Sequence, residues 1–133
     1  MMATEYSRRY VPSMPVLAVR LSAPEEAPNG QPLIALIDTG ADICVAPRAL
    51  LSRINAPASE SVWIRSQWGE PLQATRYLID LHLEQGAMPA VDIVSDPSGR
   101  EVILGRNVLN KLRLLLDGPA HGTEVLKSSD APS

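Results

Sequence analysis

Short apolar runs follow one another along most of the chain, and several of them have the period of a strand. In residues 77–83, aromatic and aliphatic side chains alternate with Leu78, Asp80 and His82, as in a strand with one face in the core. Residues 33–37 are apolar without interruption, which predicts a strand buried on both faces. Similar runs predict further strands at residues 16–21, 43–46, 61–65, 72–77, 91–94, 101–104 and 113–116.

Helical signals are few and short. Pro47 is placed to open a short turn through residue 51, and residues 106–112 can form two helical turns. Turn signals at Asn29-Gly30, residues 67–71 and residues 96–99 separate the strands. Many short strands, 12 prolines and 8 glycines therefore predict an all-β, barrel-like domain.

The two ends of the chain differ from its middle. Residues 1–12 are polar and end at Pro12, so we expect an N-terminal arm that is either mobile or an edge strand. Residues 119–133 are small and polar, which predicts a flexible C-terminal tail. One domain over residues 13–118 is expected between them, since 133 residues suffice for a single modest core.

Composition and charge exclude several classes of function. The formal net charge of −3 and the scattered basic residues argue against nucleic acid as the main partner. The single Cys44 cannot form an internal disulfide, and no apolar stretch has transmembrane length, so a cytoplasmic protein without a membrane partner is expected. His82 and His121 lack Cys or acidic partners at ligand spacing, so no metal site and no cofactor are expected.

Two motifs carry the candidate chemistry. The apolar run of residues 33–37 leads directly into Asp38-Thr39-Gly40-Ala41-Asp42, which places a carboxylate where a buried strand breaks into a tight loop. A carboxylate is costly to keep among apolar residues, so its presence there indicates a function. About sixty-five residues later, the run of residues 102–107 repeats the form of an apolar strand that ends in a glycine, Gly105.

Together, these motifs resemble the active-site loop and the apolar-apolar-Gly segment of the retropepsins, the single-domain aspartic proteases of retroviruses and their cellular and bacterial relatives. The resemblance covers residues 14–118 and implies a closed barrel with one short helix near the C-terminus. It also implies an aspartic endopeptidase, with Asp38, Thr39 and Gly40 as the catalytic loop. Such enzymes need two carboxylates, and the chain has one Asp-Thr-Gly, so a homodimer with Asp38 from each protomer is expected.

The resemblance assigns further residues to the site. Asp42 and Arg106 match an ion pair that fastens the loop to the short helix, with Gly105 and Asn107 as structural support. Substrate-binding positions in the family correspond to Ala41, Asp42, Val45 and Ile103. The hairpin tip at Trp68 and Gly69 matches the flap that closes over a peptide or protein substrate, although it has one glycine where retroviral flaps are glycine-rich.

Other interpretations remain open at the level of sequence. The main alternative is a retropepsin-like dimerisation or peptide-binding module with little or no proteolysis. The intact Asp38-Thr39-Gly40 favours the enzyme, and the unusual flap favours the module. A generic β-barrel with a coincidental Asp-Thr-Gly is a third interpretation, and the second motif argues against it. Asp42 could also be an ordinary solvated acid, and Val45 and Ile103 ordinary core residues.

Overall fold

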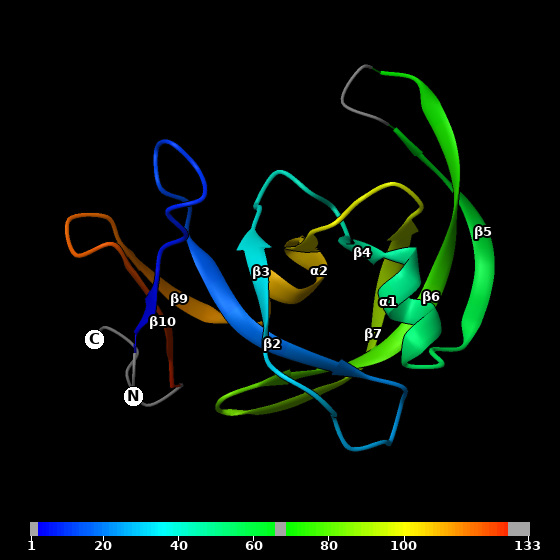
Figure 1. Cartoon of the computed structure of the whole chain (residues 1–133), viewed down its shortest axis with the longest axis horizontal. Helices are drawn as coiled ribbons and strands as arrows, with labels where there is room; N and C mark the ends of the chain where they lie inside the picture. Colours follow the sequence, from blue (N-terminus) through cyan, green and yellow to red (C-terminus); the bar gives the residue numbers. More distant parts are fainter. Residues whose placement is uncertain (1–2, 66–68, 128–133) are drawn as a thin grey trace.

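Six strands form a closed barrel. The computed structural model describes residues 3–65 and 69–127. Around the barrel, the strands come in the order β2 (Val16–Ser22), β3 (Leu33–Ile37), β8 (Val102–Leu104), β4 (Cys44–Pro47), β7 (Gly86–Asp96) and β6 (Pro71–Leu83). The barrel closes because β2 pairs with β6 as well as with β3 (Figure 1). A further strand, β5 (Ala58–Arg65), pairs with β6 and forms with it the long hairpin that extends beyond the barrel. The expected all-β closed barrel is confirmed.

The core lies inside this ring and is almost entirely aliphatic. Inward-facing residues of every barrel strand and of both helices contribute to it, and the largest fully buried side chains include Leu51, Ile79, Leu81, Ile93 and Leu104. Burial of such side chains stabilises the barrel by roughly 1.5–3 kcal/mol each. The alternation predicted for residues 77–83 accounts for the burial of Ile79 and Leu81.

A second, three-stranded sheet lies beside the barrel. Its order is β1 (Thr4–Glu5), β10 (Gly122–Leu126) and β9 (Arg113–Asp117), all antiparallel. The N-terminal arm therefore contributes an edge strand. The expectation of a flexible tail at residues 119–133 was wrong for residues 122–126, because Thr123 and Val125 are buried against the barrel and β10 pairs on both sides.

Two short helices complete the described part of the chain, at the two places where the sequence has helical signals. α1 (Arg48–Arg53) follows Pro47 and buries Leu50 and Leu51. α2 (Arg106–Leu109) is shorter than the two turns predicted, because the chain tightens after Leu109: the amides of Lys111 and Leu112 donate to carbonyls only three residues back. No helix in residues 3–65 and 69–127 is long and apolar enough to cross a membrane.

Two strands differ from their predicted form. β3 is buried on both faces only towards its end, since Ile34 is 55 % exposed whereas Ala35, Leu36 and Ile37 are buried. β7 begins at Gly86, five residues before the apolar run that predicted it, and pairs with β6 through a β-bulge between Ile79 and Leu81. The barrel thus leaves the outer face of β3 open at Ile34, four residues before Asp38.

Candidate active site

The Asp-Thr-Gly loop begins where β3 ends. The amide of Asp38 donates to the carbonyl of Leu104 at 3.1 Å, which extends the parallel β3–β8 ladder by one bond into the loop. One carboxylate oxygen of Asp38, Oδ1, accepts a hydrogen bond from the amide of Gly40 at 2.9 Å. The Asp38 side chain is otherwise exposed, so the loop presents an oriented carboxylate to the solvent.

Gly40 keeps this loop tight. A Cβ added at Gly40 would lie 3.2 Å from Oδ1 of Asp38, closer than side chains normally approach. The carbonyl of Asp38 also accepts the amide of Ala41 at 3.2 Å, which turns the chain towards β4. Any larger residue at position 40 would therefore crowd the carboxylate.

Helix α2 holds the loop from below through its backbone. The amide of Arg106 donates to the carbonyl of Ala41 at 2.8 Å, and the amide of Asn107 to the carbonyl of Asp42 at 3.3 Å. These bonds join residues far apart in the sequence at the point where β8 turns into α2. The loop is therefore part of the folded barrel wall and not a free surface loop.

The side chain of Arg106 reinforces the same contact. Its Nη1 donates to the carbonyl of Thr39 at 2.8 Å, and its Nη2 is paired with Oδ1 of Asp42. The ion pair between Asp42 and Arg106 that the resemblance implied is therefore present. Both side chains are substantially exposed, so the pair contributes geometry more than stability.

Gly105 and Asn107 join the loop, β4 and β7. A Cβ at Gly105 would lie 2.6–2.9 Å from backbone atoms of Ile43, so only glycine fits there. The amide oxygen of Asn107 accepts the backbone amide of Cys44 at 3.0 Å, and its Nδ2 donates to the carbonyl of Asp92 at 2.9 Å. Asn107 thus satisfies backbone groups of two neighbouring strands.

Cys44 takes part in this network, which the sequence did not indicate. Its thiol donates to the Asn107 amide oxygen at 3.3 Å, and its sulfur accepts the amide of Gly105 at 3.4 Å. Burial raises the pKa of the Cys44 thiol to about 11, and the hydrogen bond from Gly105 offsets only part of that rise. The residue is a neutral thiol at neutral pH and not a nucleophile.

The predicted apolar positions lie on adjoining strands. Val45 on β4 is the register partner of Ile103 on β8, and both are half-buried, as is Ala41 in the loop. Ile103 is also the register partner of Leu36, so β8 lies between the strand that leads to Asp38 and the strand that carries Val45.

The hairpin tip contributes less to the described site. Gly69 is exposed and has a left-handed backbone, with a φ of 83° and open space around it. Trp68 lies outside the described residues. The hairpin of β5 and β6 extends on the upper right of Figure 1, and within the described residues no hydrogen bond links Gly69 to the Asp38 loop.

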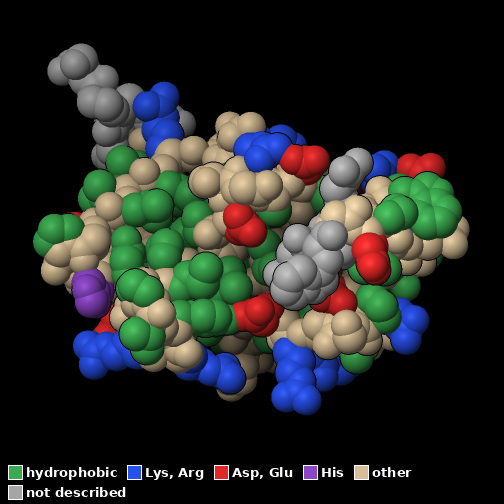
Figure 2. Space-filling model, turned by 90° about the horizontal axis from the view of Figure 1, so that it is seen from above, with side chains coloured by type: hydrophobic (Ala, Val, Ile, Leu, Met, Phe, Trp, Pro, Cys, Tyr) green, Lys and Arg blue, Asp and Glu red, His purple; other side chains and the backbone are tan. Residues whose placement is uncertain are grey.

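Acidic side chains stand near the middle of the face that bears the loop. Figure 2 looks onto the upper edge of Figure 1 and shows them beside a broad group of hydrophobic side chains. In residues 3–65 and 69–127, no three His, Cys, Asp or Glu side chains gather closely enough to hold a metal ion. The site has an exposed carboxylate that backbone hydrogen bonds hold in place, with apolar residues on the neighbouring strands. A carboxylate held in this way can give or take a proton in a reaction.

The model of the family described as retroviral aspartyl protease matches residues 13–117. The chain belongs to this family. The match includes the loop, Gly105 and both helices, and it ends with β9. No curated protein matches the chain.

Solved structures of retropepsins have the same fold. The EIAV protease in complex with the inhibitor HBY-793 is 20 % identical, with a TM-score of 0.55 over 81 % of this chain and 93 % of that one. A retropepsin-like aspartic protease from Rickettsia conorii is 9 % identical, with a TM-score of 0.61 over 87 % and 83 % of the two chains. The simian foamy virus protease is 20 % identical, with a TM-score of 0.51 over 71 % and 91 %. At these identities, the likeness is one of fold.

Proposed function

We propose that two copies of this chain form an aspartic endopeptidase in which Asp38 of each copy supplies one of the two catalytic carboxylates. The observation that carries the proposal is the Asp38 carboxylate itself. It is exposed at the end of a buried strand, and the Gly40 amide orients it. Membership of the retroviral aspartyl protease family supports the same conclusion.

The proposed reaction needs no metal and no covalent intermediate. Two carboxylates about 3 Å apart share one proton, because two negative charges at that distance repel each other strongly. The ionised member takes a proton from a water held between the two, and that water attacks the peptide carbonyl. The protonated member donates to the carbonyl oxygen, and the roles then reverse to protonate the leaving nitrogen.

The remaining residues have positioning and binding roles in this proposal. The Thr39 hydroxyl has no partner in the described part of the chain and is proposed to bond to the facing loop of the second copy. Ala41, Val45 and Ile103 would line the apolar walls beside the cleaved bond. Gly69, together with Trp68, is proposed to form the flap, and Asp42 would contact the substrate backbone while it remains paired with Arg106.

The free edge of β9 supports self-association. One edge of β9 pairs with β10, and the other has no strand partner in residues 3–65 and 69–127. Leu115 and Leu116 on this edge strand are 43 % and 46 % exposed. An apolar strand edge with unpaired backbone groups is a template for pairing with another chain. We therefore propose that β9 pairs with β9 of the second copy.

The test compares the parent with Asp38→Asn and with the matched control Asp92→Asn, a half-buried residue on β7 that contacts Asn107 through its backbone carbonyl, which the substitution keeps. Cleavage of a mixed peptide library is measured at several pH values, and dimerisation by sedimentation. Asp38→Asn should dimerise like the parent but lose cleavage by a factor of about 10³ or more, since the acid–base pair is gone. Asp92→Asn should cleave like the parent.

Mixing experiments test the contribution of two copies. An excess of Asp38→Asn added to the parent should suppress cleavage, because mixed dimers have one carboxylate. Equal cleavage by parent and Asp38→Asn would contradict the proposal. Peptide binding without cleavage by the parent would instead support the alternative, a peptide-binding module.

A further inference from the structure

A pocket of about 370 Å³ lies between the N-terminal arm and the outer face of β3. Its floor is apolar and consists of Val16, Ile34 and Leu36. The arm contributes Arg9 and Tyr10 to its walls. The volume is at the lower end of the range for ligand pockets, which suits one side chain of a longer ligand more than a whole cofactor.

The pocket lies on the same side of the barrel wall as the carboxylate. Leu36 is two residues before Asp38, and in an extended chain residues two apart point to the same side. Glu101, on the opposite wall, is likewise two residues before Ile103, the register partner of Leu36. Two residues of strand span roughly 7 Å, so a peptide cleaved at Asp38 would pass the pocket within a few residues of the cleaved bond.

The pocket is lined by equal numbers of positive and negative side chains, but they are not equally free to bind a ligand. Four charged residues line it, and Glu5 is already paired with Arg8 at 3.2 Å. No ion pair in the described part of the chain involves Arg9, Arg100 or Glu101. Two guanidinium groups and one carboxylate are therefore left without an ionic partner, and of the two guanidinium groups that of Arg9 lies over the apolar floor.

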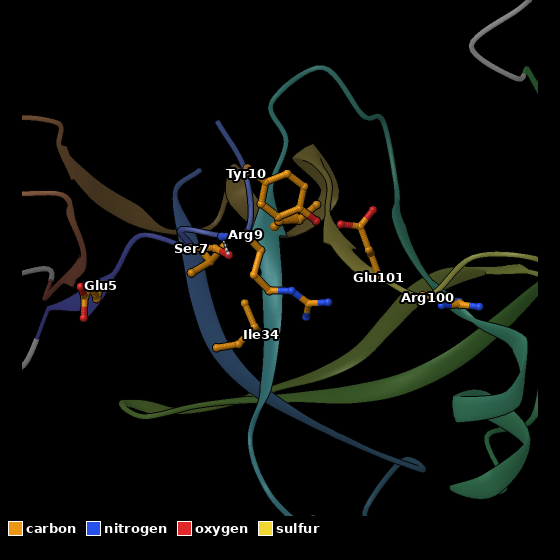
Figure 3. A pocket seen from close by; sticks show the side chains of 9 residues that line it. Glu5, Ser7, Arg9, Tyr10, Ile34, Arg100 and Glu101 are labelled. Atoms are coloured by element: carbon orange, nitrogen blue, oxygen red, sulfur yellow. Dashed lines mark hydrogen bonds between the residues drawn. The ribbon is translucent and has the colours of Figure 1, made fainter. Parts of the chain in front are cut away.

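The side chain of Arg9 occupies the centre of this arrangement. Figure 3 shows it extending across β3, with Ile34 below, Tyr10 above and Glu101 on the far side. Arg100 lies farther away and points outwards. A guanidinium over an apolar floor can bind a carboxylate while aliphatic carbons of the same side chain contact the floor.

We propose that this pocket is a specificity pocket that binds an acidic side chain of the substrate, with Arg9 as the counter-charge. The inference rests on the proposed endopeptidase and adds the substrate class. Glu101 limits the selectivity, because its carboxylate repels the same ligand. Glutamate fits better than aspartate, since its longer side chain reaches the guanidinium from a backbone that runs past Leu36.

The experiment uses a set of peptides that share one parent sequence. In each peptide, a single position near the cleaved bond is replaced by Glu, Gln, Lys or Leu. The kcat/KM of the parent is compared with that of Arg9→Gln, Glu101→Gln and the control Arg48→Gln, which removes an exposed guanidinium on α1 that does not line the pocket. At one position, the parent should prefer Glu over Gln by about tenfold, as a charge-assisted hydrogen bond provides. Arg9→Gln should abolish this preference, Glu101→Gln should increase it, and Arg48→Gln should leave it unchanged.

Two results would overturn the inference. One is the absence of a Glu preference at every position, or a preference that Arg9→Gln does not alter. The other is an equal loss for all peptides in Arg9→Gln together with weaker dimerisation, which would assign Arg9 to contact with the second copy.

Binding measurements separate this inference from the proposed function. The same peptides are titrated into the Asp38→Asn protein, and the ratio of Kd values for Glu and Gln peptides is determined with and without Arg9→Gln. An Arg9-dependent preference in binding without any cleavage by the parent would reject the catalytic proposal and support the pocket. Cleavage by the parent with no such preference would support the catalytic proposal and reject the pocket.

Discussion

Gly105 packs against the backbone of Ile43, the residue that follows the Asp38–Asp42 loop. Its missing side chain lets the backbone of Ile43 approach to a distance that no Cβ would permit. The same approach allows the amide of Gly105 to reach the sulfur of Cys44. The shape of the loop therefore depends on the absence of a Cβ atom at position 105.

Gly105→Ala should destabilise the protein by roughly 2–3 kcal/mol, because the added methyl group meets backbone atoms that cannot turn aside. The loop carbonyls that α2 holds would shift, so cleavage should fall as well. Thermal unfolding and kcat/KM measure the two effects. Gly118→Ala is the control, since nothing lies within 4 Å of a Cβ there. Equal stability of the two variants would contradict the packing argument.

At the residue scale, some contacts of the site could be predicted from the sequence and others could not. The ion pair of Asp42 and Arg106 was implied by the resemblance to the retropepsins and is present. The hydrogen bonds of Cys44 did not follow, because a lone cysteine carries no signal that separates a packed thiol from a bonded one. The position of Arg9 over Ile34 did not follow from the sequence either, because only folding brings these two residues together.

Among the elements, the pair of β6 and β7 contains the most unusual buried charge. Asp80 is only 8 % exposed and lies at the bulge of this ladder. Its Oδ1 accepts the amide of Ala90 at 3.0 Å and its Oδ2 the amide of Glu25 at 2.8 Å. Both of these residues have a left-handed backbone, with φ values of 54° and 68°. One carboxylate thus fixes a bulge and the loop after β2.

The hydrogen bonds from Ala90 and Glu25 hold the pKa of Asp80 below its usual value, and the nearby His82 acts in the same direction. A carboxylate with a lowered pKa in the folded state stabilises the fold fully above its unfolded pKa of about 3.9. This stabilisation is lost as the pH falls through the folded pKa. The fold should therefore lose part of its stability in acid through this single group.

Asp80→Asn should be less stable than the parent near neutral pH, because an amide can accept only one of the two backbone hydrogen bonds. Its free energy of unfolding should also depend less on pH below about 4. Urea unfolding at fixed protein concentration and several pH values measures both effects. Asp92→Asn should retain the acid dependence of the parent. A variant at position 80 with an unchanged acid dependence would show that Asp80 does not cause it.

The elements that the sequence missed are those whose stability comes from neighbours. β10 has a weak alternating pattern, with Thr123 and Val125 on its buried side, within a segment that is otherwise small and polar. It forms because it pairs with β1 on one side and with β9 on the other. Local propensity does not reveal such pairing between distant segments. The barrel strands were predicted because their own residues are apolar enough to be buried in any arrangement.

At the scale of the whole molecule, the proposed association of two copies can be tested through β9. If β9 pairs with β9 of the second copy, Leu116→Lys should weaken dimerisation, because a charged edge residue opposes pairing between chains. Cleavage by this variant should decline at protein concentrations at which the parent is still active. Sedimentation and dilution series of activity measure this. Ala49→Lys, on the exposed side of α1, adds the same charge elsewhere and should behave like the parent.

A Leu116→Lys protein with the dimer affinity of the parent would exclude β9 as the contact. A far-ultraviolet circular dichroism spectrum like that of the parent is needed to show that the variant is folded. The residue is 46 % exposed, so its replacement leaves the core intact.

The position of β10 also determines where this protein can be shortened. The family match ends at residue 117, the last residue of β9, so the barrel and both helices lie within it and β10 does not. A chain cut at that border would keep the barrel but uncover the backbone groups of β1 and β9 that β10 now satisfies. Uncovered strand edges promote aggregation. We therefore expect a chain that ends at residue 117 to be less soluble than the full chain, although it contains the whole family match.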